Sequence, residues 1–254
     1  MNERLVTPQG YGLAVTENLI PGARVTGIIV HGFQSSRKSP AAIAALEALL
    51  ESGVNGVIFD LYAHGDSDGD FKDMSVAKAI DNVEAVIKHV HDRDPTQKII
   101  LIGSSFGGLV SQYVAVKFAP LITALILRAA VSNWWELWKE RITEDEIKNW
   151  KKTGYHTGEV RDGIQTTFGL EFLGDIQRQD IYTDVAPQIK VPTLIIHGDA
   201  DEVVPLSQSR ELKKHIPLSD LVVLPEADHR FTDTGDMAAY QHHIENFLRK
   251  SRII

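Results

Sequence analysis

The chain has 254 residues, of which 43% are hydrophobic and 24% are charged, a composition ordinary for a globular protein with one sizeable core. Its formal net charge is -8 and no cluster of Lys and Arg offsets it, which excludes a typical nucleic-acid binder. The chain has no cysteine, which excludes disulfides, thiolate catalysis and cysteine-ligated zinc.

The first residues, 1–4, lack the charged-then-apolar pattern of a signal peptide, and no apolar run reaches the length of a membrane span. We therefore expect a cytoplasmic protein with no membrane partner. The oligomeric state does not follow from these features.

Short aliphatic strands alternate with helical patterns over the first half of the chain. A helix is predicted to begin with Ser39 as N-cap and Pro40 at its first position, and to stop near Gly53. Another follows from the apolar stripe over 76–90. The predicted extended segments are 11–15, 25–30, 57–59, 98–102 and 121–127. This order is typical of an α/β protein, a mostly parallel sheet with helices on both faces.

The alternation stops between 131 and 184, where the chain becomes charged, aromatic and helical in propensity. All four tryptophans lie in this segment, and the charges from Glu140 to Lys152 are interpreted as a solvated helix face. Strand 192–196, a helix near 207–214, strand 221–224 and a last helix around 237–248 then resume the pattern. We expect a core formed by 1–130 and 185–254, with 131–184 inserted as a small cap.

The peptide Gly103-Ser104-Ser105-Phe106-Gly107 stands where a predicted strand becomes a helix. A G-x-S-x-G sequence at such a junction predicts a tight, strained turn that pushes the serine hydroxyl out above the sheet. Ser104 does not fit this frame, because glycine would then be needed at positions 102 and 106. Ser105 is therefore the predicted nucleophile.

A serine hydroxyl needs a base and a group that orients the base. In a parallel sheet such groups gather at the carboxyl ends of strands. His229 follows strand 221–224 and is the predicted base. The acid is expected to be one of three aspartates, Asp199 or Asp201 in the loop after strand 192–196 or Asp228 beside His229.

Two backbone N–H groups are expected to hold the oxyanion. One belongs to Phe106, directly after the nucleophile. The other is assigned to Phe33 in the loop His31-Gly32-Phe33, where Gly32 would allow close approach of the backbone and the Phe33 ring would line the acyl pocket.

Five segments in this order resemble the α/β-hydrolase-fold serine hydrolases over nearly the whole chain outside the cap. They are His31-Gly32-Phe33, residues 60–67, 103–107, 197–205 and Asp228-His229. In the family pattern H-G-x-x-D-x-x-V-P the acid is the aspartate four places after the histidine, which implies Asp201. The loop 60–67 departs from the family turn D-x-x-G-H-G at Ala63, and we interpret this loop as structural.

The size, the H-G-F loop and the short cap are similar to small carboxylesterases of the cinnamoyl/feruloyl esterase type. This resemblance implies a cofactor-free ester hydrolase with a Ser-His-Asp triad and an acyl-enzyme, acting on small aryl esters. An acyl thioesterase, an acyltransferase or another small-acyl, lipase-like hydrolase is the alternative. A non-catalytic binding protein that kept the fold is the alternative from another class.

The remaining histidines and tryptophans have two interpretations each. His31, His64 and His197 together with His229 could form a zinc site, but we expect no metal and interpret the first three as braces of their loops. Trp134, Trp135 and Trp138 are candidate substrate contacts, although large aromatics usually bury area. Because Trp134 and Trp135 are adjacent, they are expected to point to different sides of a helix.

Overall fold

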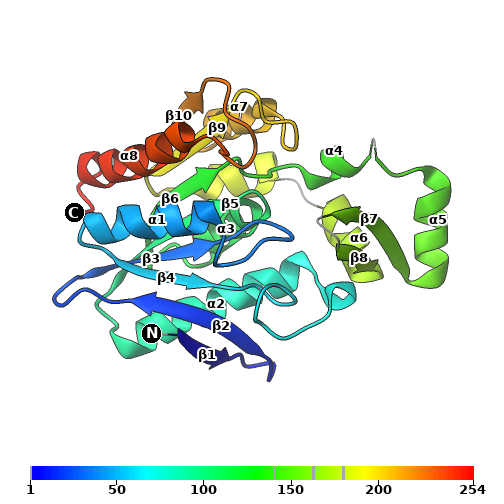
Figure 1. Cartoon of the computed structure of the whole chain (residues 1–254), viewed down its shortest axis with the longest axis horizontal. Helices are drawn as coiled ribbons and strands as arrows, with labels where there is room; N and C mark the ends of the chain where they lie inside the picture. Colours follow the sequence, from blue (N-terminus) through cyan, green and yellow to red (C-terminus); the bar gives the residue numbers. More distant parts are fainter. Residues whose placement is uncertain (1, 140, 162–163, 179–180) are drawn as a thin grey trace.

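Strand β5 (Lys98–Ser104) runs through the middle of the sheet, and every residue after Lys98 in it is buried. Its aliphatic, β-branched sequence suits a strand covered on both faces. The computed structural model describes residues 2–139, 141–161, 164–178 and 181–254. Within these ranges lies an eight-stranded sheet in the order β1-β2-β4-β3-β5-β6-β9-β10 (Figure 1).

In this sheet the strands β4, β3, β5, β6, β9 and β10 pair in parallel, each with the next in that order. The pairs β1–β2 and β2–β4 are antiparallel. The other strands are β1 (Asn2–Val6), β2 (Gly12–Asn18), β3 (Val25–Val30), β4 (Asn55–Phe59), β6 (Ile122–Arg128), β9 (Thr193–Gly198) and β10 (Ser219–Leu224). The mostly parallel α/β sheet is therefore confirmed, with β1 as an edge strand that the pattern did not predict.

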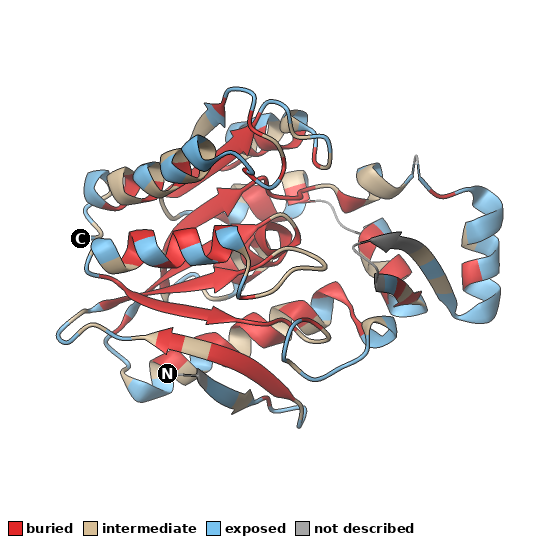
Figure 2. Cartoon of the chain, viewed as in Figure 1, coloured by how far each residue is buried: buried red, intermediate tan, exposed pale blue. Residues whose placement is uncertain are grey.

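Helices cover both faces of the sheet (Figures 1 and 2). Helices α1 (Pro40–Glu51) and α8 (Thr234–Lys250) pack together on one face. Helices α2 (Val76–Arg93) and α3 (Phe106–Lys117) pack on the other, and α7 (Leu206–His215) lies beside β9 and β10. The N-cap of α1 is as predicted, because the Ser39 hydroxyl accepts the Ala42 N–H at 3.3 Å.

Residues 131–184, which we call the cap segment, lie beyond the carboxyl ends of the strands (Figure 1). The segment contains α4 (Trp134–Trp138), α5 (Glu144–Thr153), β7 (Tyr155–Arg161), β8 (Ile164–Gly169) and α6 (Leu170–Arg178). The π-helical turn η2 (Ile181–Val185) follows α6 and packs against α3 and α7 of the core. The 3₁₀ turn η3 (Ala186–Gln188) then leads to β9. Residues 140, 162, 163, 179 and 180 lie outside the described residues.

The expectation of a helical cap is wrong for the antiparallel pair β7–β8. Buried Thr166 and Phe168 alternate with the less buried Gln165 and Thr167, which is the period of a strand with one covered face. The charged stretch is helical in α5, whose side chains are largely exposed apart from buried Trp150. Glu140, at the start of the predicted charged face, is not among the described residues.

The cap segment meets the core at the short 3₁₀ turn η1 (Phe71–Asp73). Gly169 at the end of β8 lies so close to the Lys72 carbonyl that a Cβ at this position would collide with it. None of the helices in the described ranges combines the length and the apolarity needed to cross a membrane.

Candidate active site

Ser105 lies between β5 and α3 with φ 52° and ψ -116°, a backbone conformation that L-residues with side chains rarely adopt. The flanking glycines are required by space. A Cβ at Gly103 would lie 2.6 Å from the Ser111 hydroxyl, and one at Gly107 would collide with the carbonyl of Val30. The strained serine turn predicted from the sequence is therefore present.

The structure brings Ser105 and His229 together from loops 124 residues apart in the chain. The Ser105 Oγ lies 3.1 Å from the His229 Nε2, and the His229 Nδ1 lies 2.8 Å from an Asp201 carboxylate oxygen. With Nδ1–H donating to Asp201, the Nε2 lone pair faces the serine hydroxyl, as a general base requires.

Asp201 is held by its own loop. Its Oδ1 accepts the N–H groups of Val203 and Val204 at 2.9 and 2.8 Å, and its Oδ2 also lies 3.1 Å from His197 Nε2. Burial by itself would raise the pKa of Asp201, but the hydrogen bonds from His197 and His229 outweigh it and hold the pKa far below the usual range. Asp201 is thus a carboxylate at neutral pH.

The two alternative acids have other partners. Asp199 accepts the Glu226 N–H at 2.6 Å and so ties the loop after β9 to the loop after β10. Asp228 accepts the N–H groups of Arg230 and Thr232, each at 3.0 Å, within the His229 loop. Among the described residues, His229 Nδ1 is hydrogen-bonded to Asp201 and to neither of the alternative acids.

The backbone of Gly32 runs directly past the nucleophile. A Cβ built on Gly32 would lie 3.2 Å from Ser105 Cβ and 3.8 Å from its Oγ. The next N–H along the chain is that of Phe33, while the Phe106 N–H is the first of helix α3 and has no intrahelical acceptor. Both candidate oxyanion donors therefore belong to residues beside Ser105.

His31 and His64 brace the loop that carries Phe33, as the sequence predicted. His31 Nδ1–H donates to the Gly32 carbonyl at 2.7 Å while Nε2 accepts the Leu61 N–H at 3.0 Å. His64 Nε2 accepts the Gln34 N–H at 3.1 Å. Burial lowers the pKa of His31 to about 4 and that of His64 to about 3, so both rings are neutral.

The histidine nitrogens considered for zinc are therefore engaged. In the described ranges no group of three His, Cys, Asp or Glu side chains is placed to hold a metal. His197, the remaining candidate, donates Nε2–H to the Val204 carbonyl at 2.9 Å and accepts the Ser209 hydroxyl on Nδ1 at 2.7 Å.

The loop 60–67 is built around Asp60. Its buried carboxylate accepts the Arg37 N–H at 2.6 Å and the Asp66 N–H at 2.9 Å and also pairs with the Arg37 guanidinium. Ala63 adopts φ 61°, a conformation that glycine takes without strain. The loop makes contacts typical of a structural element, as the sequence interpretation held.

The Phe33 ring is surrounded by aromatic rings from both the core and the cap segment. Core rings Phe71 and Phe106 lie 5.5 and 5.7 Å from it, centroid to centroid. Trp134 in α4 lies at 5.5 Å and Phe168 and Phe172 both at 5.7 Å. We call these six residues the aromatic cluster.

The three candidate tryptophans differ in position. Trp134 is 6% exposed and packs on Phe106, the residue after the nucleophile, at 4.6 Å. Trp138 packs against two rings of the cap segment, those of Trp150 and Phe172, with centroid distances of 6.1 and 5.9 Å. Trp135 is half-buried at the margin of the hydrophobic cluster in which Trp134 is buried, so the two adjacent tryptophans differ in burial.

Two polar links between the loops of the core and the cap segment were not predicted. The Gln34 side-chain amide donates to the buried Thr166 hydroxyl of β8. The buried Gln208 amide of α7 accepts the N–H groups of Ser132 and Asn133 at 2.9 and 3.1 Å and donates to the Asn133 carbonyl at 3.0 Å. Both glutamines join elements far apart in sequence, so no local pattern marks them.

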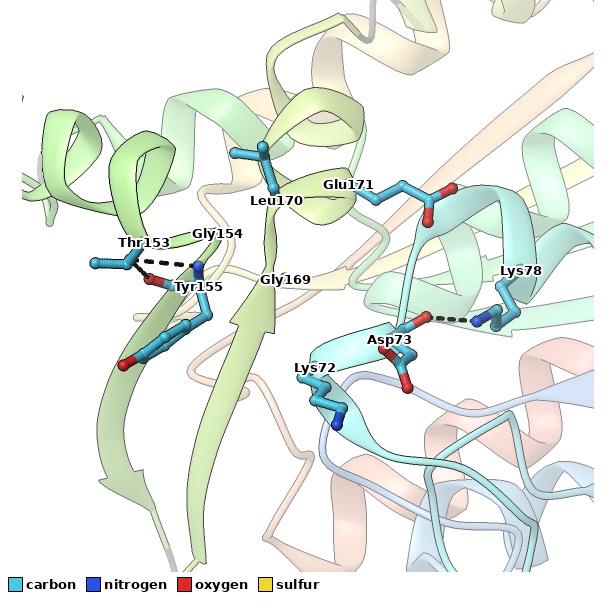
Figure 3. Close-up of a pocket in the computed structure, with 9 residues that line it drawn as sticks. All are labelled: Lys72, Asp73, Lys78, Thr153, Gly154, Tyr155, Gly169, Leu170 and Glu171. Atoms are coloured by element: carbon cyan, nitrogen blue, oxygen red, sulfur yellow. Dashed lines mark hydrogen bonds between the residues drawn. The ribbon is translucent and has the colours of Figure 1, made fainter.

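A cavity of about 440 Å³ opens between η1 and the cap segment (Figure 3). Lys72 and Lys78 line one side of it, and Tyr155 and Leu170 line the other. Neither Ser105 nor His229 borders this cavity, which lies on the flank of the cap segment.

The fold and the strained serine turn are those of an α/β hydrolase. The model of the alpha/beta hydrolase family matches residues 28–240, so the chain belongs to this family. Its named relatives include thioesterases and a serine hydrolase, and the protein is accordingly a hydrolase.

Relatives with known names are distant. The chain is 25% identical over 224 residues to the rat palmitoyl-protein thioesterase ABHD10, mitochondrial, covering 83% of this chain and 70% of that protein. It is 23% identical to the human serine hydrolase BPHL, covering 94% of this chain and 88% of the relative.

A similar solved structure is that of Est1E from Butyrivibrio proteoclasticus with bound ferulic acid. Its TM-score is 0.86 at 24% identity, and each chain is covered completely. The structure of mouse alpha/beta hydrolase domain-containing protein 10 has a TM-score of 0.83 at 22% identity, covering 98% of this chain and 99% of the other. At these identities the likeness concerns the fold.

Proposed function

We propose that the protein is a serine carboxylic-ester hydrolase in which Ser105 is the nucleophile, His229 the base and Asp201 the orienting acid. The observation that carries the proposal is the unbroken hydrogen-bonded chain from Ser105 Oγ through His229 to Asp201, at 3.1 and 2.8 Å. The strained backbone of Ser105 supports it further, because strain of this kind is typical of a functional residue.

The reaction follows from the geometry. Ser105 Oγ attacks the ester carbonyl carbon while His229 Nε2 takes the hydroxyl proton, and the N–H groups of Phe33 and Phe106 hold the oxyanion. Collapse of this intermediate releases the alcohol, which takes the proton from His229. Water then attacks the acyl-Ser105 ester and gives one proton to His229. Collapse of this second intermediate releases the carboxylic acid, and Ser105 Oγ takes the proton back from His229. These steps need no cofactor.

The aromatic cluster supports an acyl group of aromatic character. Phe33 and Phe106 supply the proposed oxyanion donors, and their rings join Trp134 in one packed group. We propose that residues 131–184 act as a cap that shapes this acyl site. Of the three candidate tryptophans, Trp134 is the one whose ring packs against Phe106, the residue after the nucleophile. The bound ferulic acid named for Est1E agrees with an aryl ester, although that ligand belongs to that protein.

A thioesterase is the second candidate, because the ABHD10 relatives are named palmitoyl-protein thioesterases. The same acyl-enzyme would form, with a thiol in place of the alcohol as leaving group.

The cytoplasmic location and the absence of a nucleic-acid partner stay predictions.

A fluorophosphonate probe followed by peptide mass spectrometry tests the nucleophile. We expect one adduct on Ser105, lost in Ser105→Ala and retained in Ser104→Ala, the matched neighbouring serine. If folded wild-type protein forms no adduct, the catalytic proposal is contradicted. The result would then favour a non-catalytic binding protein with the same fold.

Substrate panels then separate the candidates. Methyl ferulate, p-nitrophenyl esters of increasing chain length and a palmitoyl thioester of a small thiol are compared by kcat/KM. Much faster hydrolysis of medium-chain esters than of methyl ferulate contradicts the aryl preference, and a preference for the thioester favours the second candidate.

A further inference from the structure

Arg128 places a positive charge in the protein interior behind the candidate triad. It is the last residue of β6 and is 5% exposed. Its guanidinium bonds go to neutral oxygens, those of Ser104 and His229, within the part of the chain that the structure describes. Burying a cation without a directly bonded carboxylate costs free energy, so a charge in this place calls for a physical reason.

The backbone of Arg128 holds the nucleophile. Strands β5 and β6 pair in parallel with Ser104 opposite Arg128, so the N–H of Ser105 donates to the Arg128 carbonyl at 2.9 Å. This bond extends the pairing of the two strands to Ser105, whose backbone takes the strained φ of 52°.

The side chain of the same residue holds the base. Its Nη1 donates to the backbone carbonyl of His229 at 2.7 Å, and its Nε donates to the Ser104 hydroxyl at 3.2 Å. The guanidinium also stacks over the Phe231 ring, 4.8 Å from the centroid. Phe231 has φ 56°, so the loop that carries His229 is itself strained and needs support.

We propose that Arg128 is a positioning residue that sets the distance between Ser105 Oγ and His229 Nε2. The Arg128 carbonyl accepts the Ser105 N–H, and the Arg128 guanidinium donates to the His229 carbonyl, so one residue holds the backbone of both. The inference rests on the proposed function, because only that function makes Ser105 and His229 a catalytic pair. Only arginine combines several fixed donors with a flat face that stacks on a ring.

Replacement of Arg128 tests this role through kcat. In Arg128→Met, a variant of similar length without donors or charge, we expect kcat for an ester to fall on the order of 100-fold, because small misplacements of reacting groups have effects of this size. KM should stay within about threefold, because the residue does not touch substrate. Arg128→Lys, which retains the charge and a donor, should lie between wild type and Arg128→Met.

Chemical rescue separates positioning from general stability. Millimolar guanidinium added to Arg128→Ala should raise kcat per active site, counted by fluorophosphonate labelling, and should leave wild type unchanged. Arg93→Met is the control, because Arg93 pairs with Glu17 at the end of α2, away from the site. It should keep wild-type kcat.

The outcomes are distinct. Wild-type kcat per labelled site in Arg128→Met overturns the inference, as does a loss of activity explained wholly by fewer labelled sites. Failure of every Arg128 variant to fold would assign the residue to stability and overturn it too. If wild type itself neither labels at Ser105 nor turns over esters, the proposed function fails instead.

Discussion

The Trp134 ring packs edge-on against the Phe33 ring, with 5.5 Å between centroids and 75° between the ring planes. Trp134 comes from the cap segment and Phe33 from the loop after β3, whose N–H is the proposed oxyanion donor. Because the Phe33 ring and its N–H are parts of one residue, packing in the cap segment also bears on the oxyanion site.

We expect Phe33→Ala and Trp134→Ala to be non-additive. Each should lower the free energy of unfolding by about 3–5 kcal/mol, the range for truncation of a Phe or Trp side chain to Ala. The double variant should lose less than the sum, by roughly 0.5–3 kcal/mol, because the rings touch. Urea unfolding of wild type, the two single variants and the double variant measures the coupling in stability. Values of kcat/KM for the same four proteins measure the coupling in activity.

The control for this cycle is Phe247→Ala on α8, which packs in the hydrophobic core on the other face of the sheet. Its effects should add to those of Phe33→Ala within about 0.5 kcal/mol. Additivity of Phe33→Ala and Trp134→Ala as well would contradict the coupling.

Asn substitutions distinguish the acids. Asp201→Asn should lower kcat by a factor on the order of 10⁴, because an amide favours the wrong His229 tautomer, as in other triads. Asp199→Asn should lower kcat less than about 10-fold, since Asp199 bonds the Glu226 N–H rather than His229. Steady-state kinetics on one ester decides, and a larger loss in Asp199→Asn would refute the assignment of Asp201.

Alanine at two glycines should separate folding from catalysis. Gly107→Ala places a Cβ against the carbonyls of Val30 and His31, so we expect little folded protein. Gly32→Ala meets Ser105 Cβ at 3.2 Å, which a small shift relieves, so it should fold but lose on the order of 100-fold in kcat. Circular dichroism and kcat measure the two effects. Full activity in Gly32→Ala would count against close approach of this loop to the nucleophile.

Stability should fall in acid because of His31 and His64. Their folded-state pKa values, about 4 and about 3, lie below the ordinary value of 6.5, so the unfolded chain binds more protons in this range. The stabilisation is complete above pH 6.5 and is lost as the pH falls toward 4. For His31 the loss reaches about 3 kcal/mol, at 1.36 kcal/mol per pKa unit.

Urea unfolding at pH 7 and pH 4.5 tests this dependence. His64→Gln keeps an acceptor for the Gln34 N–H but does not titrate, so the difference between the two pH values should shrink. Ile100→Val, buried in β5, is the control that lowers stability without removing a histidine and should keep the full difference. An unchanged difference in His64→Gln would show that His64 does not contribute.

Much of the fold follows from local sequence. The aliphatic runs of β3, β5, β6 and β9 are buried on both faces, so composition alone marks them. Ser105 and Phe33 follow from a strand end and a glycine, and His229 follows from a strand end, which are local features. The choice of Asp201 among three aspartates comes from the family pattern. β1 is different: its sequence Asn-Glu-Arg-Leu-Val is polar and its pairing to β2 is a tertiary property.

The contacts that surround the site could not be predicted in the same way. Arg128 follows an apolar strand like many surface arginines, and its buried position depends on the packing of β5, β6 and the His229 loop. Phe168 and Phe172 lie in a segment whose sequence does not predict the β7–β8 pairing. Their approach to Phe33 depends on how the cap segment folds back.

The aromatic cluster also determines where the sequence is free to diverge. Positions on the outer side of α5 face solvent and can change without affecting the core, as Figure 2 shows for this exposed helix. Positions 134, 168 and 172 instead contact Phe33, so a substitution at any of them must also refill the space around its ring. If the aromatic cluster shapes the acyl site as proposed, a change of substrate carries the same requirement. Specificity in this lineage should therefore evolve by compensated pairs of substitutions, with Phe33 as the fixed member.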